Sequence, residues 1–471
     1  MIEQNKPRRV LSVFSLVMIN VIAVDSIRNL PFSAEYGFSI LFYYVLAAIC
    51  FFIPIALVAA ELATGWPENG GMYVWIREAF GKKWGFVAIW LQWIYNVVWY
   101  PSILAFLVST ATYLIDPSLD KNRWFMLAMV MIVFWGATIL NCFGMRLSGW
   151  ISTIGAIIGT LLPMVLMILL GAVWLWEGHP SQIQFGWSHL WPDLSSIDNL
   201  AFLIAVLFGL LGMEMSAVHA EEVKNPQRDY PRALRWSTLL ILGSLMLSSL
   251  AIAVVIPKDQ ISLVSGVIDA FGLFFKVFHM TWMIPVIAIC IIIGGISGVS
   301  AWIIGPTKGL LAAARDDSLP NWLQKTNKHG APTPILLLQG VLFSILSSLF
   351  LLFPSVNAGY WFFSALTAQI AMIVYLFMFA AAIYLRYKYP NKTRAYQIPF
   401  GNIGMWLTAG IGFITCLGAI AIGFIPPTGI VLGSLKRYES LLALGIILSL
   451  LIPLLLHRIS RARDCPLKRE L

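Results

Sequence analysis

The fold of this chain is decided by the stretch Val24-Asp25-Ser26-Ile27-Arg28-Asn29, which interrupts its first long apolar segment. Two opposite charges stand there among hydrophobic neighbours. An ionised side chain at the centre of a bilayer costs about 2.5 to 3.5 kcal/mol on insertion scales, so such residues usually face a cavity, pair with each other or serve a transport pathway. Asp25 and Arg28 are therefore candidate functional residues, and a purely structural pair between them is the alternative.

The composition around this stretch is typical of an integral membrane protein. Of the 471 residues, 59% are hydrophobic and 11% are charged, too few polar residues to cover a soluble globule of this size. Twelve apolar stretches are long enough to cross a hydrocarbon core of about 30 Å as helices. They span residues 10–36, 38–64, 84–115, 124–142, 147–176, 199–222, 232–256, 281–314, 334–353, 360–386, 403–425 and 438–458.

The basic residues predict how the chain is oriented. Most of the 31 lysines and arginines fall on one side of the membrane if the N-terminus is cytoplasmic, and basic loops of membrane proteins lie mainly in the cytoplasm. The sequence therefore predicts a multi-pass protein of the bacterial inner membrane with both termini cytoplasmic. Orientation explains the net charge of +9 without a nucleic-acid partner. The lipid bilayer is the expected partner, and the choice between monomer and homodimer stays open.

A second interruption lies in the sixth apolar segment, at Gly209-Leu210-Leu211-Gly212-Met213-Glu214-Met215-Ser216. Segments 1 and 6 enter the membrane from opposite sides. Asp25 and Glu214 each lie about fifteen residues into their helix, roughly 22 Å at 1.5 Å per residue, so the breaks are expected to meet near mid-membrane. Paired interruptions five helices apart are typical of inverted-repeat transporters, and two unrelated, glycine-softened helices are the alternative.

These patterns predict an all-α membrane protein with twelve transmembrane helices and a five-plus-five inverted repeat, in which helices 1 and 6 are discontinuous. The expected units are a cytoplasmic N-terminus (1–9), repeat 1 with helices 1–5 (10–176), repeat 2 with helices 6–10 (199–386), helices 11 and 12 (403–458) and a short basic cytoplasmic tail (459–471).

The chemistry of the breaks suggests a ligand site. An unwound stretch exposes amides and carbonyls that only a cavity or a ligand can satisfy. Asn29 is expected to cap the restarted helix, with Pro31 in its first turn, so that the free amides attract a carboxylate. Asp25 and Glu214 suit an ammonium group, and the fork of Arg28 suits a second carboxylate. A cavity with both signs of charge favours a zwitterion.

Four motifs carry a family resemblance: Glu61-Leu62-Ala63-Thr64 with the following run 66–75 and Phe80-Gly81, the run 212–219 continuing into 225–233, the run 302–309, and the run 396–401. In these motifs the chain resembles the amino acid, polyamine and organocation transporter superfamily, and most of all its glutamate/γ-aminobutyrate antiporter branch. The resemblance implies a substrate cavity between helices 1, 3, 6, 8 and 10, alternating access, and exchange of an amino acid for its decarboxylation product.

The breaks and the resemblance together define the candidate site residues. The substrate-binding candidates are Val24, Asp25, Ser26, Arg28, Asn96, Gly212, Met213, Glu214, Ser216 and Trp361, with Trp93 and Trp99 beside Asn96 on helix 3. The resemblance implies that Glu214 senses protons or substrate. Asp25 is a second candidate for proton sensing, and so is His219, because histidine changes charge between about pH 5 and 8. A simpler reading of His219 is that it ends a helix, and Glu61 is expected to anchor the cytoplasmic loop.

Two departures from the branch bear on the substrate. The small glycine-serine-glycine turn of the superfamily is replaced by Val24-Asp25-Ser26, and Arg28 stands where the branch leads us to expect a neutral residue. Helix 8 has Ser297-Gly298-Val299 where an acidic residue is expected. The identity of the substrate therefore stays open.

The sequence contains no phosphate loop, metal-ligand spacing or nucleophile elbow, so neither an enzyme nor a cofactor or metal requirement is expected. The prediction is a secondary active amino acid transporter of the antiporter type, which exchanges an amino acid such as glutamate for a related amino acid or its decarboxylated amine. A proton-coupled amino acid symporter is the alternative. A channel or nutrient sensor with the same fold is a third class.

Overall fold

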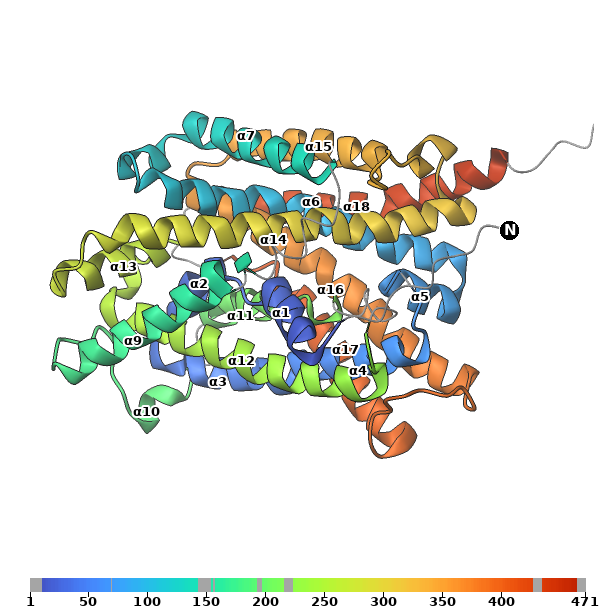
Figure 1. Ribbon diagram of the computed structural model, residues 1–471, viewed down its shortest axis with the longest axis horizontal. Coiled ribbons are helices and arrows are strands. Elements are labelled where there is room, and N and C mark those ends of the chain that lie inside the picture. The colour runs from blue at the N-terminus through green and yellow to red at the C-terminus, as the bar shows by residue number, and fades with distance from the viewer. Residues whose placement is uncertain are drawn as a thin grey trace, which may run out of the picture.

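The computed structural model describes residues 11–68, 70–142, 154–155, 157–192, 197–215, 223–426 and 434–463. Within these ranges the chain is helical and forms no strand, and Leu11 and Val223 make one isolated bridge. Figure 1 shows long helices that lie side by side, most of them along one common direction.

The helices follow one another along the chain with short connections. The first half contains α1 (Val13–Val24), η1 (Ile27–Asn29), α2 (Leu30–Ala34), η2 (Gly37–Ser39), α3 (Ile40–Ala47), η3 (Ala48–Phe52), α4 (Ile53–Gly65), α5 (Met72–Phe80), α6 (Lys82–Thr112), η4 (Pro117–Lys121), α7 (Arg123–Cys142), η5 (Ile157–Leu161), α9 (Leu162–Trp176), α10 (Trp187–Leu190) and α11 (Ile197–Gly209). The second half contains α12 (Pro226–Val255), η7 (Lys258–Gln260), α13 (Gly266–Val277), α14 (Met283–Ala313), η8 (Ala314–Ser318), η9 (Asn321–Gln324), α15 (Thr333–Ser348), η10 (Leu349–Leu352), α16 (Val356–Lys388), α17 (Gly401–Ile422) and α18 (Leu435–Arg463).

The membrane helices agree with the apolar stretches of the sequence. In the described part of the chain, 11 helical segments are long and apolar enough to cross a membrane, and a shorter apolar helix, Leu203–Met215, corresponds to predicted helix 6. The all-α fold with twelve membrane helices is thus confirmed. Three short helices, α5, α10 and α13, were not predicted, and α12 begins at Pro226 rather than at 232. Hydropathy does not detect these parts because they are amphipathic or polar.

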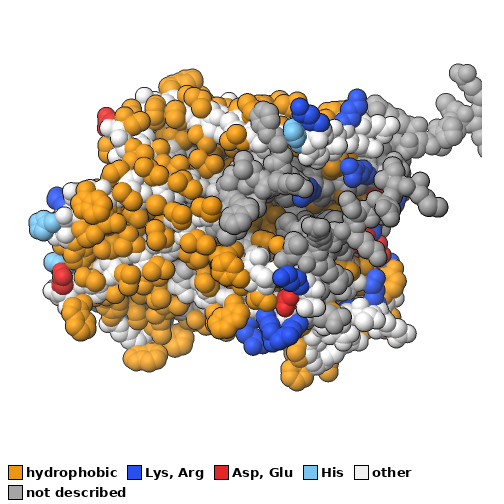
Figure 2. Space-filling model, viewed as in Figure 1, with side chains coloured by type: hydrophobic (Ala, Val, Ile, Leu, Met, Phe, Trp, Pro, Cys, Tyr) orange, Lys and Arg blue, Asp and Glu red, His pale blue; other side chains and the backbone are white. Residues whose placement is uncertain are grey.

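The core lies along α6, which packs against both α14 and α16. Apolar side chains dominate the outer face in Figure 2, as expected for a surface covered by lipid, and Lys and Arg side chains gather toward one side of it. This separation matches the one that the distribution of basic residues predicts.

Helix 1 breaks where the sequence predicts. α1 ends at Val24, Ser26 is extended (φ −111°, ψ 115°), and the chain restarts through η1 into α2 with a proline in its first turn. Asn29 occupies the predicted N-cap position, but its side chain makes no capping hydrogen bond. The capping prediction is therefore wrong in its chemistry. The reason is local: Asn29 is in the helical region (φ −86°, ψ −12°), whereas a capping side chain needs extended backbone.

Helix 6 breaks after Gly209, and the backbone of Gly212 beyond this break has φ +113°. A Cβ atom at Gly212 would lie 2.9 Å from the carbonyl oxygen of Ala23 and 3.1 Å from Cζ2 of Trp302. Only glycine fits this conformation and this close approach. The two breaks therefore lie against each other, as the sequence predicts.

Candidate functional site

A cavity with about 480 Å³ of empty space lies beside the break in helix 1. Its walls come from residues 22, 23 and 25–28, from Trp99, Ile103 and Phe106 of α6, from Gly159 and Thr160 of η5, and from α14 between Ile291 and Trp302. Helix 1, helix 3 (α6) and helix 8 (α14) line the cavity as the resemblance implies. Helix 5 (η5) contributes a wall where helices 6 and 10 were expected. Of the predicted site residues, Asp25, Ser26, Arg28 and Trp99 line this cavity.

Arg28 is 1% exposed and is held by neutral groups. Its Nη1 donates hydrogen bonds to Ser102 Oγ (3.1 Å) on α6, and to Tyr360 OH (3.3 Å) and Ser364 Oγ (3.5 Å) on α16. The hydroxyl of Tyr360 donates in turn to the carbonyl oxygen of Arg28, at 3.2 Å. Arg28 therefore both lines the cavity and binds helix 10, which itself contributes no lining residue.

Aromatic rings surround the same guanidinium group. Its Cζ atom lies 4.9 Å from the ring centroid of Phe208 on α11, and 5.6 Å from the centroids of Trp99 and Tyr360. Such rings stabilise a cation without neutralising it. No carboxylate among the described residues pairs with Arg28, and its Nε has no hydrogen-bond partner. A buried charge without a counter-ion is costly, so the geometry suits an anionic ligand.

Asp25 is also buried, at 2% exposed, and binds a different helix. Its Oδ2 accepts a hydrogen bond from Ser244 Oγ of α12 at 2.7 Å, while Oδ1 has no partner in the described part of the chain. The alternative of a structural Asp25–Arg28 pair is therefore wrong. Both charges face one cavity with unused hydrogen-bonding capacity.

Glu214 lies in the turn after α11 and is 3% exposed. Its Oε2 accepts a hydrogen bond from the hydroxyl of Tyr375 on α16 at 2.5 Å, and that hydroxyl accepts from the amide of Gly212 at 3.1 Å. Tyr375 thus connects the residues after the helix 6 break to helix 10. Glu214 does not line the cavity beside helix 1, although Trp302 contacts both that cavity and the helix 6 break.

The other predicted site residues are not in the cavity wall. Asn96 donates to the carbonyl oxygen of Gln92 at 2.7 Å. Trp361 donates to Tyr438 OH at 3.3 Å and lines a second cavity, with about 200 Å³ of empty space, beside Phe208. Val24 and Met213 are buried in the core. Trp93, expected in the wall, instead donates to Gln339 of α15 at 2.8 Å. Ser216 and His219 lie outside the described residues.

Comparison with known proteins agrees with this architecture. The family model described as amino acid permease matches residues 10–450. The chain belongs to this family. An uncharacterized transporter of Legionella pneumophila is 58% identical over 95% of this permease and 97% of that protein. A glutamate/gamma-aminobutyrate antiporter of Lactococcus lactis is 30% identical over 95% of this permease and 90% of its own length. The resemblance found in the sequence motifs is confirmed.

A more distant relative of the permease is named as an antiporter of amines. A protein of Lactococcus lactis named as a probable agmatine/putrescine antiporter is 24% identical over 82% of each chain. The family and these relatives are transporters, and in the described part of the permease no three His, Cys, Asp or Glu side chains are placed to hold a metal ion.

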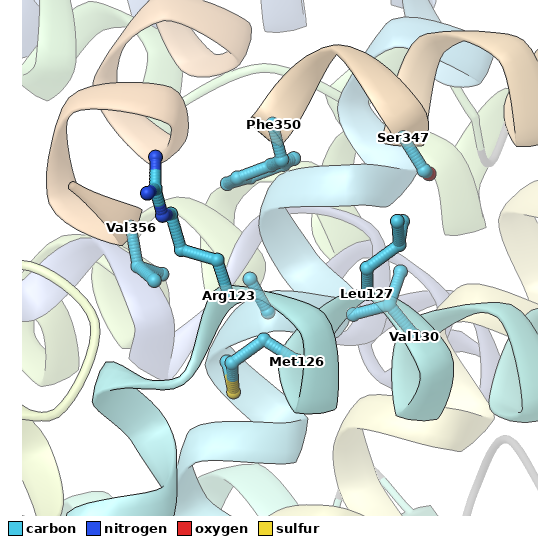
Figure 3. Close-up of a pocket in the computed structure, with 8 residues that line it drawn as sticks. Arg123, Met126, Leu127, Val130, Ser347, Phe350 and Val356 are labelled. Carbon is cyan, nitrogen blue, oxygen red and sulfur yellow. The ribbon is translucent and has the colours of Figure 1, made fainter. Parts of the chain in front are cut away.

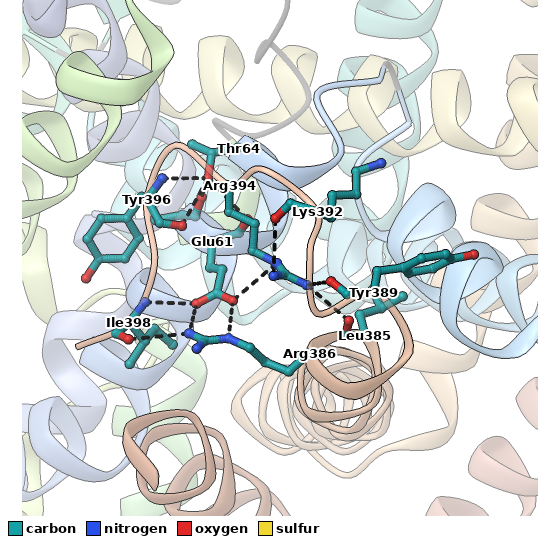
Figure 4. Close-up of polar contacts among 10 residues, drawn as sticks. Glu61, Thr64, Leu385, Arg386, Tyr389, Lys392, Arg394, Tyr396 and Ile398 are labelled. Carbon is teal, nitrogen blue, oxygen red and sulfur yellow. Dashed lines mark hydrogen bonds and ion pairs between the residues drawn. The ribbon is translucent and has the colours of Figure 1, made fainter. Parts of the chain in front are cut away.

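The permease has a second buried ionic cluster, at the end of α4 (Figure 4). Glu61 accepts hydrogen bonds from Arg386 Nε (2.7 Å) and Nη2 (2.6 Å) and from the amide of Ile398 (2.8 Å), and Arg394 Nε lies 3.5 Å from it. These contacts join helix 2 to the end of helix 10 and the loop after it. The anchoring role expected for Glu61 agrees with this geometry.

Several residues of the site were missed in the sequence. They are Ser102, Phe208, Ser244, Tyr360, Ser364 and Tyr375, all of which bind or surround Asp25, Arg28 or Glu214. Each is a single hydroxyl or aromatic residue in an apolar helix. Such residues are common in packed membrane helices, so their presence alone gave no usable signal.

Proposed function

We propose that this permease is an antiporter that exchanges an acidic amino acid, such as glutamate, for a related amino acid or its decarboxylated amine by alternating access. The observation that carries the proposal is that Asp25 and Arg28 line one cavity, both buried and neither paired with an opposite charge among the described residues. An amino acid with a second carboxylate supplies partners for both groups.

The groups around helix 1 suggest how such a substrate binds. Arg28 would hold a substrate carboxylate through its planar fork, and the open Oδ1 of Asp25 would accept from the ammonium group. The helix dipole adds little, because α2 has only 5 residues. Arg28 therefore becomes the main anion-binding group, and we assign substrate selectivity to it.

The partners of the two charges also suit alternating access. In the proposed motion, helices 1, 2, 6 and 7 rock against the remaining helices. Asp25 binds Ser244 on helix 7, within the moving group, whereas Arg28 binds Ser102 and Tyr360 on helices 3 and 10, across its boundary. A substrate carboxylate that binds Arg28 would weaken its hydrogen bonds to helices 3 and 10. This would favour the movement of helices 1, 2, 6 and 7.

Proton sensing belongs to the same proposal. We assign it to Glu214 and Asp25, which are buried acids next to the two breaks, each with one carboxylate oxygen that lacks a partner in the described part of the chain. The relatives named as antiporters support exchange as the mode of transport. We also propose the five-plus-five division of helices 1–10 and an inner-membrane location with cytoplasmic termini, as the basic residues indicate.

Counterflow into proteoliposomes tests the exchange. Vesicles loaded with unlabelled glutamate or γ-aminobutyrate should take up labelled glutamate, and empty vesicles should take up almost none. A panel of neutral and basic amino acids and amines, measured at two pH values, identifies the substrates. Net uptake into empty vesicles along an imposed proton gradient would instead establish the symporter, and conductance without saturable uptake would contradict both.

A further inference from the structure

A separate cavity with about 300 Å³ of empty space, part of it open to the outside, lies between α6, α7, α15 and α16, away from the breaks (Figure 3). Met126, Val130, Phe350 and Val356 give it apolar walls, and its polar lining groups are Arg123 and Ser347. Figure 3 shows these two residues toward opposite sides of the cavity. The transport mechanism proposed above uses none of these residues.

Ser347 is the first unusual feature of this cavity. It is 0% exposed, and its hydroxyl has no hydrogen-bond partner in the described part of the chain. Serines in helices usually donate to a carbonyl one turn earlier. Its neighbours Ser344 and Ser348 do so, at 2.8 Å and 2.9 Å. The hydroxyl of Ser347 is therefore available to an occupant of the cavity, and a buried hydroxyl without a hydrogen bond destabilises the fold.

Arg123 supplies the charge at the rim. It is the exposed first residue of α7, and its Nη1 donates to the carbonyl oxygens of Phe353 (2.8 Å) and Leu351 (3.4 Å). These bonds hold the guanidinium in place without neutralising it, because no carboxylate in the described residues forms an ion pair with Arg123. A fixed guanidinium with unused donors suits a phosphate group.

The surroundings place this cavity at the lipid boundary. Figure 1 shows α7 and α15 side by side along one edge of the molecule. Their outward residues are apolar and exposed, among them Ile132 (64%) and Ile345 (57%). Trp124, next to Arg123, is 71% exposed, and exposed tryptophans at helix ends lie at the headgroup level of a bilayer. Arg123 is thus at headgroup depth, with apolar walls deeper in the membrane.

The opposite end of the seam between these helices is sealed. Trp135 Nε1 donates to Ser344 Oγ at 3.1 Å, and the Trp135 ring packs over Gly340. An occupant therefore enters from the Arg123 end.

We propose that this cavity binds one anionic phospholipid, with its phosphate on Arg123, an ester carbonyl oxygen on the hydroxyl of Ser347 and part of an acyl chain between Met126, Val130 and Phe350. The cavity favours a lipid over a free phosphate because a small anion would leave the apolar walls and Ser347 unfilled.

Native mass spectrometry of the purified permease tests this site. Protein from vesicles of phosphatidylcholine with phosphatidylglycerol should retain one more phosphatidylglycerol than the variant Arg123→Gln, with several-fold lower occupancy in that variant. Arg437→Gln is the matched control, since Arg437 is an exposed arginine near the start of another membrane helix, α18, and it should retain the lipid. Equal retention by Arg123→Gln would overturn the proposal.

Two further measurements distinguish lipid binding in the cavity from binding to the charge of Arg123 alone. Val130→Phe fills the space and keeps Arg123, so it should also lose the retained lipid, and retention in this variant would show that the cavity is not used. Excess inorganic phosphate should not displace the lipid, and displacement would identify a free-phosphate site instead. Because each variant is compared by size-exclusion profile and by counterflow, a folding defect is recognised, and the outcome does not depend on which substrate is transported.

Discussion

Asp25 and Arg28 are three residues apart in the chain, yet they bind different helices and not each other: Asp25 accepts from Ser244 of α12, and Arg28 donates to Ser102 of α6 and Tyr360 of α16. Because the backbone at Ser26 is extended, the side chains of Asp25 and Arg28 point toward different helices. As a result, one cavity holds a buried guanidinium group and a buried carboxyl group, each with capacity for a ligand.

Arg28→Gln should lower the uptake of acidic amino acids by about tenfold or more, because the substrate carboxylate loses a charged, forked donor. Arg28→Lys should restore part of the activity, since lysine keeps the charge but not the planar geometry. Arg437→Gln, at an exposed arginine, is the control and should transport normally. Counterflow in proteoliposomes measures all three. Unchanged uptake of every substrate by correctly inserted Arg28→Gln would remove the selectivity role.

Glu214→Gln should flatten the pH dependence of transport. The carboxyl group can change charge beside the helix 6 break, and the amide cannot. Tyr375→Phe should alter the same profile, because Tyr375 donates to Glu214 and accepts from Gly212. Initial rates from pH 5 to 8 test both variants, with Glu439→Gln at an exposed acid as the control. An unaltered profile in Glu214→Gln would exclude Glu214 as the proton sensor.

Glu61→Gln should destabilise the folded permease by about 3 to 5 kcal/mol, because two buried arginines would lose their shared carboxylate. Arg386 and Arg394 are 8% and 7% exposed. Glu68→Gln is the matched control, because Glu68 pairs with Arg77 at the surface, where an ion pair contributes about 0 to 1 kcal/mol. Thermal denaturation in detergent compares them, and similar midpoints for the two variants would contradict the prediction.

Gly212→Ala should cost about 1 to 3 kcal/mol and impair transport, because alanine strains a backbone with positive φ and its Cβ approaches Ala23 and Trp302. Gly243→Ala on α12 is the control: a Cβ there meets nothing within 4 Å. The control should keep full transport. Wild-type activity in Gly212→Ala would show that the helix 6 break tolerates another conformation.

Glu35, in the turn between helices 1 and 2, should make stability depend on pH. Burial raises the pKa of its carboxyl from 4.5 to about 7, with Lys258 opposing this rise and Asp259 adding to it. The unfolded state therefore ionises first, and stability is lost as the pH increases from about 4.5 to 7. Compared with Glu35→Gln, the wild type should lose about 1 to 3 kcal/mol over this range. Parallel melting profiles of the two proteins from pH 4 to 8 would refute this.

The sequence by itself determined the membrane class, the twelve helices and the two breaks. These features depend on local composition: long apolar runs form helices in a bilayer, and charges or glycines at residues 24–29 and 209–216 interrupt them. For the same reason the sequence identified Asp25 and Arg28 as unusual, since a charge in an apolar segment is visible without any structure.

Only the tertiary structure decided which groups these charges bind. Arg28 and Tyr360 are 332 residues apart, Asp25 and Ser244 are 219 apart, and Glu61 and Arg386 are 325 apart. No spacing rule predicts such pairs, because a hydrogen bond depends on the direction of a side chain after the helices have packed. The same cause made Trp93 a partner of Gln339 rather than part of the cavity wall, and it replaced the expected walls from helices 6 and 10 with one from helix 5.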